Sequence, residues 1–182
     1  AARHPEQARR AAAKVHVDYL VLGPLTDPEG ALTPDAPALH EGGNSTRHVR
    51  IRHGVQGPRA HMVVTGEYEI GMQDQAPLGP ESGLAIPDGV GGVDLYIATQ
   101  WLHIDRDQLA EILALPPDRV RLTMAGIGGA FGAREDLSMQ AHACMLALLT
   151  GRPVKIAYSR PDSFVGNVNP RPGRRQYVHE AT

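Results

Sequence analysis

The order of secondary structure is decided by residues 93–158, which read VDLYIATQWLHIDRDQLAEILALPPDRVRLTMAGIGGAFGAREDLSMQAHACMLALLTGRPVKIAY. Apolar residues alternate with polar ones over 93–98, 120–124 and 154–158, and this period of two predicts three strands. The segments between these strands carry apolar residues at helical spacing instead. The alternation of strands and helices favours an α+β fold, in which the helices pack on a sheet.

Two helices are expected between these strands. Asp105 with Gln108 three residues later resembles a capping box, so the first helix is predicted to begin at Asp105 and to stop before Pro116-Pro117. The second helix is expected from Leu137, and Thr150-Gly151 should close it, because glycine is the preferred residue just after a helix.

The part of the chain before residue 93 carries weaker signals. We expect a helix through about Ala13, a strand over Val15–Val21 and a surface connection over Gly23–Thr46. Two pairs of strands should follow. In the first, His48–His53 pairs with His61–Ile70 across a Gly57-Pro58 turn, and in the second Leu84–Ile86 pairs with Val93–Ala98. We therefore predict the tail of a preceding domain over 1–22, a linker over 23–46 and a larger domain that starts at 47 and runs through 182. The chain opens on Ala1, which hints at an excised piece of a longer protein.

Composition and charge exclude several classes of function. With 42% hydrophobic and 21% charged residues and a net charge of −2, the chain resembles an ordinary globular protein, and nucleic acid is not an expected partner. No apolar run approaches the roughly 20 residues that cross a bilayer, so we expect no membrane association and a cytoplasmic location. The single cysteine, Cys144, suits a buried helix face and cannot hold an iron–sulfur cluster, which would have to lie on another chain.

The glycine-rich stretch Gly126–Glu135 is the most informative for function. Its glycines let backbone amides approach an anion closely, and a helix N-terminus expected after it would favour negative charge. The spacing matches neither the dinucleotide fingerprint, since Phe131 stands where glycine is required, nor a phosphate-binding P-loop. An anion site and a plain strand-to-helix turn both remain open, and Glu135 could simply stabilise the helix N-terminus.

A second candidate is Gln73, which lies where a strand runs into the proline-punctuated stretch Gln73–Glu81. Its amide could donate to an oxo ligand or satisfy backbone groups of its own loop. The nine histidines show no metal-binding spacing.

Together these stretches resemble the molybdenum-cofactor-binding subunit of the xanthine dehydrogenase/xanthine oxidase (molybdenum hydroxylase) family. The segments that carry the resemblance are Val17–Tyr19, Asp27–Leu32, Gln73–Glu81, Ala98–Gln100, Leu109-Ala110, Leu115–Val120, Gly128–Glu135 and Leu149–Lys155. The resemblance implies part of the molybdenum cofactor-binding domain of aldehyde oxidase and xanthine dehydrogenase, with helices packed on a mixed sheet and residues 47–182 forming its N-terminal part. Ala133-Arg134 departs from the family's glycine-lysine pair.

The resemblance also implies roles for single residues. Gln73 is similar to the glutamine whose amide approaches an oxo ligand of molybdenum, and Phe131 with Gly132 to the backbone beside the metal. Gly128, Gly129 and Ala130 complete the implied cofactor-binding segment. Glu135 is similar to the substrate-binding glutamate of the purine-oxidising members, which suggests xanthine or hypoxanthine as substrate.

The implied cofactor is molybdenum–molybdopterin, and the implied partners are FAD-binding and iron–sulfur (2Fe–2S) subunits or domains together with the remainder of the molybdenum subunit. Since the family's catalytic base lies outside these residues, we expect the chain alone to be inactive and to hold no molybdenum. Two alternatives stay open: an aldehyde- or carbon monoxide-type oxidoreductase of the same family, and a non-catalytic assembly domain with the same fold.

Overall fold

The computed structural model describes residues 1–54 and 61–181. The chain forms two compact units, one containing Val64–His179 and one containing Ala2–Val63 together with the residues that follow His179. The candidate site lies in the first unit, so the fold of that unit is described in more detail.

The larger unit contains a four-stranded sheet in the order β4-β3-β2-β5. Its strands are β2 (Ser82–Pro87), β3 (Val93–Ile97), β4 (Val120–Met124) and β5 (Val154–Ala157). Strand β2 is antiparallel to both β3 and β5, whereas β3 and β4 are parallel, with Leu95 opposite Leu122. The sheet is therefore mixed, and the predicted α+β fold is confirmed.

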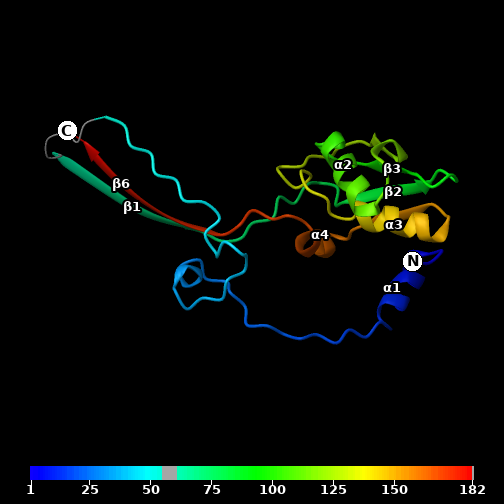
Figure 1. Ribbon diagram of the computed structural model, residues 1–182, viewed down its shortest axis with the longest axis horizontal. Helices are drawn as coiled ribbons and strands as arrows, with labels where there is room; N and C mark the ends of the chain where they lie inside the picture. The colour runs from blue at the N-terminus through cyan, green and yellow to red at the C-terminus, as the bar shows by residue number, and fades with distance from the viewer. Residues whose placement is uncertain (55–60, 182) are drawn as a thin grey trace. The chain divides into compact units, whose positions relative to one another are not determined.

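Two helices, α2 (Leu102–Leu113) and α3 (Gln140–Thr150), cover this sheet (Figure 1). Helix α2 packs on β4, α3 packs on β2, β3 and β5, and the two helices contact each other. Along β3 the alternation of side chains is clean, since Val93, Leu95 and Ile97 are buried while Tyr96 is exposed. The predicted sequence of strand, helix, strand, helix, strand is thus correct.

The core of this unit consists of apolar residues from all these elements. Leu95, Leu109 and Cys144 are fully buried in it. Burial raises the pKa of the Cys144 thiol to about 12, which suits a core residue and not a nucleophile.

The predicted start of α2 at Asp105 is wrong. The helix begins at Leu102 with Trp101 as its N-cap, and Asp105 lies within the first turn with its side chain fully buried. An N-cap carboxylate would accept from the free amides of the first turn, and the buried Asp105 does not do so. The helix ends at Leu113, and its C-cap Ala114 adopts the left-handed conformation before Pro116. Helix α3 begins at Gln140, three residues after the predicted Leu137, and Gly151 closes it as expected.

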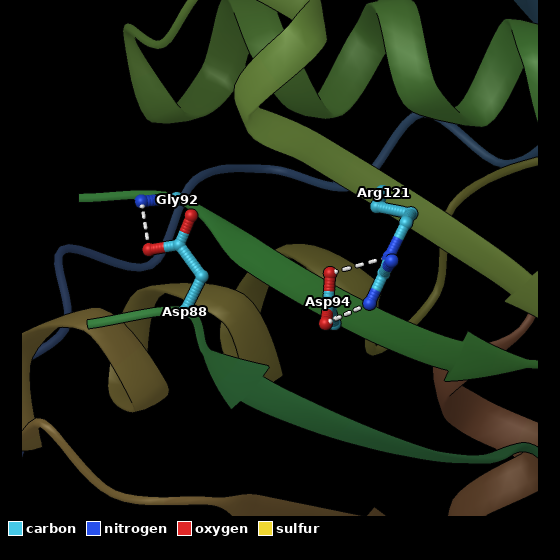
Figure 2. Close-up of polar contacts among 4 residues, drawn as sticks. All are labelled: Asp88, Gly92, Asp94 and Arg121. Carbon is cyan, nitrogen blue, oxygen red and sulfur yellow. Dashed lines mark hydrogen bonds and ion pairs between the residues drawn. The ribbon is translucent and has the colours of Figure 1, made fainter. Parts of the chain in front are cut away.

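Polar contacts fix the β2–β3 connection and the β3–β4 pair (Figure 2). Asp88 Oδ1 accepts from Val90 N at 2.8 Å and from Gly92 N at 2.7 Å, and these bonds hold the pKa of Asp88 below its usual range. On the neighbouring strands, which are in register, Arg121 donates from Nε and Nη2 to the two carboxylate oxygens of Asp94. This pair is bidentate and largely exposed, so we expect little stabilisation from it.

The strand over His61–Ile70 is confirmed as β1 (Met62–Ile70), but its predicted partner is wrong. Residues 48–53 form no strand, and β1 pairs instead with β6 (Gly173–Ala181) in a two-stranded sheet (Figure 1). The pairing brings together segments about a hundred residues apart, which local patterning does not reveal. The expected Gly57-Pro58 turn lies outside the described residues.

The predicted strand over Val15–Val21 is also wrong. Helix α1 (Pro5–Ala12) precedes it as expected, and the alternating Val15, Val17 and Tyr19 are all exposed, so the pattern has no surface to pack against. The connection that follows contains one short 3₁₀ helix, η1 (Gly30–Leu32), and a second, η2 (Pro117–Arg119), precedes β4.

Helix α4 (Arg160–Gly166) was not expected from the sequence. It begins with a capping box in which the Ser159 side chain and the Asp162 side chain each bond the other's backbone amide. A serine followed three residues later by an acidic residue was the available signal. Across the described ranges we find no helix with the length and apolar character that a bilayer crossing requires.

Candidate functional site

The glycine-rich loop connects β4 to α3 and is longer than expected. Because α3 begins only at Gln140, Glu135 lies five residues before the helix and cannot stabilise its N-terminus. The prediction that the dipole of the following helix favours negative charge at this loop is wrong for the same reason, because the effect of a helix dipole fades within the first turn. Any affinity of the loop for an anion must therefore come from its own backbone amides.

The centre of the loop is a tight turn with an unusual backbone. Gly129, Phe131 and Gly132 have φ values of 94°, 55° and 89°, and Ala133 N donates to Ala130 O at 3.0 Å. A positive φ is rare for an aromatic residue and costs free energy, and such positions cluster at ligand sites. The Phe131 side chain is 76% exposed, so packing does not explain its conformation.

Within the described residues, the amides of 127–132 donate to no protein acceptor. The flanking amides of Ala125 and Ala133 are used, because Ala125 N donates to Ile97 O at 2.8 Å and Ala133 N closes the turn. The loop nevertheless has a defined position, since Ala130 and Ala133 are buried. It offers a row of fixed donors, which is the arrangement that holds anionic groups elsewhere.

The second candidate segment, Gln73–Glu81, leads from β1 to β2 and is held by residues 168–170. Gln73 N donates to Pro170 O at 3.2 Å, and Gln75 Nε2 donates to Val168 O at 2.9 Å. The Gln73 amide group is exposed and donates to Gly71 O at 3.3 Å, so in this conformation it satisfies its own loop. Ala76, whose N–H donates to Asp74 Oδ1 at 2.6 Å, is another non-glycine residue with a positive φ, at 43°.

The structure brings the two segments together. A side chain at Gly128 would place its Cβ 3.7 Å from Gly79 N, and one at Gly132 would lie 3.9 Å from Gln75 Nε2. Two stretches about fifty residues apart in sequence therefore form neighbouring surfaces. In the described part of the chain Gln73 itself makes no hydrogen bond to the glycine-rich loop, so the residues that meet are Gly79 and Gln75.

Sequence reasoning missed the buried Arg134 and Glu81 and the partly buried Arg160, whose side chains bond the Gln73–Glu81 segment and its surroundings. Arg134 Nη2 donates to Gly79 O at 2.5 Å, and from α4 Arg160 Nη2 donates to Pro77 O. Glu81 is 4% exposed and accepts from Asn167 Nδ2 at 3.1 Å. Nothing in the local pattern marks these side chains as buried, because their partners are carbonyls and side chains far away in sequence.

A cavity of about 10 Å³ lies beside this network, lined by Glu81, Ile97, Ala98, Ala133, Arg134, Asp136, Ser138 and Gln140. It has room for no more than one water molecule. A cofactor-sized ligand would have to bind on the open side of the glycine-rich loop. In the ranges described, no three His, Cys, Asp or Glu side chains are placed to hold a metal ion.

Comparison with known proteins places these loops in a family. A model of the molybdopterin cofactor-binding domain matches residues 44–181. The chain is 36% identical over 175 residues to a probable xanthine dehydrogenase subunit of Bacillus subtilis (strain 168), covering 94% of this chain and 24% of that protein. It is 32% identical over 169 residues to the nicotinate dehydrogenase large molybdopterin subunit of Eubacterium barkeri, covering 90% of this chain and 39% of that protein.

Among solved structures, the aldehyde oxidoreductase of Desulfovibrio gigas superposes with a TM-score of 0.87 at 25% identity, over 100% of this chain and 20% of that one. The chain thus spans well under half the length of each of these relatives. The match to the domain covers both loops and the whole four-stranded sheet. The chain belongs to the molybdopterin cofactor-binding domain family.

Proposed function

We propose that this chain is a segment of the molybdenum subunit of a xanthine dehydrogenase-type hydroxylase and forms one wall of its cofactor and substrate site. The observation that carries the proposal is the row of unpaired amides over 127–132 beside the loop that follows Gln73. The similarity to a probable xanthine dehydrogenase subunit supports it.

The residues present fit an anionic metallopterin. The turn over Gly128–Gly132 has no large side chain except Phe131, whose ring is exposed, so a planar ligand can approach the amides directly. Gln73 has an exposed amide with a single long hydrogen bond, which it could exchange for a bond to an oxo ligand. When bound, the cofactor would supply the hydroxylation chemistry, with water as the source of oxygen.

Glu135 is the residue we assign to the substrate. It is partly buried, and among the described residues it has no hydrogen-bond or ion-pair partner. A carboxylate without a partner at the end of the cofactor loop is free to accept from a heterocyclic N–H group and to stabilise charge that develops during reaction. This supports a purine such as xanthine or hypoxanthine.

An aldehyde-type activity is the second candidate, because the similarity to the Desulfovibrio aldehyde oxidoreductase extends over the entire chain. In either case the electrons would leave through FAD-binding and 2Fe–2S subunits or domains, which we propose as partners in the cytoplasm. The single cysteine of this chain cannot ligate such a cluster.

The test is kinetic and uses the complete subunit assembled with its redox partners. We expect Glu135→Ala to lower kcat/KM for xanthine by about 100-fold, the effect of losing one group that stabilises transition-state charge, with molybdenum content unchanged. Glu111→Ala, on the exposed side of α2, serves as the matched control and should leave both unchanged.

An unchanged rate in Glu135→Ala would contradict the substrate role. A wild-type enzyme that oxidises benzaldehyde with a higher kcat/KM than xanthine would favour the aldehyde-type candidate.

A further inference from the structure

Arg134, directly before Glu135, is tied to two other segments through both its side chain and its backbone. Its Nη2 donates to Gly79 O at 2.5 Å, and Nη1 lies 3.5 Å from Ala98 O. Its own carbonyl accepts from Gln100 N at 3.2 Å and from Thr99 Oγ1 at 3.3 Å. One residue therefore links the glycine-rich loop to the Gln73–Glu81 segment and to the end of β3.

The guanidinium of Arg134 lies in a buried environment, which favours its bond to Gly79 O. Arg134 is only 6% exposed, and within the described ranges it forms no ion pair. Glu81 and Asp136 line the same small cavity and supply negative charge nearby. A buried cation is costly unless its donors are bonded. Among the described residues Arg134 Nε has no hydrogen-bond partner, so the guanidinium depends on the bonds from Nη2 to Gly79 O and from Nη1 to Ala98 O.

We propose that Arg134 is a positioning residue that fixes the glycine-rich loop against the Gln73–Glu81 segment and thereby places the free amides and Glu135 relative to each other. The inference rests on the proposed function for its kinetic consequence, but not for the structural link itself. The planar fork of arginine can reach two carbonyls at once, whereas a lysine ammonium is a single point charge. Lysine at this position should therefore replace the link only in part.

The structural link is tested by hydrogen exchange in the complete subunit. In Arg134→Met, which keeps an unbranched apolar side chain but removes the donors, the hydrogen-bonded amides of Ala133 and Tyr158, which bond Ala130 O and Glu81 O, should exchange about tenfold faster or more, as expected for lost charge-assisted hydrogen bonds. Arg134→Lys should give an intermediate rate. Arg121→Met, which removes the exposed bidentate pair to Asp94 on another strand, is the control and should leave both segments unchanged.

The kinetic consequence is measured per bound molybdenum, so that lost cofactor is not mistaken for lost positioning. We expect kcat/KM for xanthine to fall about tenfold in Arg134→Met, since small misplacements of a catalytic constellation have effects of this size, and to recover in part in Arg134→Lys. Unchanged exchange, exchange that rises equally throughout β2–β4, or a loss of turnover explained entirely by missing molybdenum would each overturn the proposal.

The two proposals fail in different ways. If Glu135→Ala leaves xanthine turnover unchanged while Arg134→Met still loosens both segments, the proposed substrate role fails and the structural link stands. If Glu135→Ala abolishes turnover while Arg134→Met leaves exchange unchanged, the positioning role fails instead.

Discussion

At the scale of single residues, Asp105 is an ionisable residue that was expected at the exposed start of a helix but is buried. Its carboxyl group is fully buried, and desolvation raises its pKa above the usual 3.8. The nearby Thr99 hydroxyl opposes this rise in pKa, the negative charge of Asp136 adds to it, and the Gln140 amide opposes it. The folded protein therefore holds this proton at a pH where the unfolded chain has released it.

The sign of the pH dependence follows from this difference. The stability associated with the protonated Asp105 is fully present below pH 3.8 and is lost as the pH rises through the higher pKa of the folded state. We predict that Asp105→Asn, which stays neutral, flattens this part of the profile and is more stable than wild type at pH 7.

The measurement is urea unfolding between pH 4 and pH 7.5, with the exposed Asp118→Asn as control. A variant whose destabilisation grows as the pH rises would show that the ionised carboxylate is needed instead.

At the scale of elements, the β2–β3 connection depends on one glycine. A Cβ on Gly92 would lie 2.5 Å from Asp88 Oδ2 and 2.6 Å from Arg119 O, and the second contact is with backbone that cannot easily move. We predict that Gly92→Ala destabilises the protein by about 1–3 kcal/mol, the usual cost of forcing extra volume into a packed site.

Thermal or chemical unfolding tests this prediction against Gly23→Ala, where the added methyl group meets nothing within 4 Å. A loss no larger than that of the control would mean that the Asp88 turn rearranges freely.

At the scale of the whole molecule, we propose that residues outside this chain are needed to complete the site. The chain spans 24% of the Bacillus relative, and the cavity beside the glycine-rich loop has a volume of about 10 Å³, far too small for a cofactor. We predict that the purified 182-residue chain contains no stoichiometric molybdenum and does not oxidise xanthine, whereas the complete subunit does both. Metal analysis by mass spectrometry and a turnover assay on both proteins check this, and stoichiometric metal with turnover in the short chain would refute it.

The sequence by itself determined the elements whose patterns are local. Alternation in Val93–Ile97 and the glycine at 151 are read within a few residues, because side-chain direction and capping depend on the immediate backbone. For this reason the three strands, the two helices that cover the sheet and the buried Cys144 could be predicted, whereas the mixed character of the sheet was implied by the family resemblance. The glycine-rich loop was also identified as the functional candidate from its composition.

Only the tertiary structure decided which distant segments meet. Nothing local states that β1 pairs with β6, that Gly128 lies against Gly79, or that Arg134 and Asp105 are buried. The reason is physical: the free energy of burying a charge or pairing a strand depends on partners that the chain brings in from tens of residues away. The donors of the loop were visible in the sequence, but their placement depends on these long-range contacts.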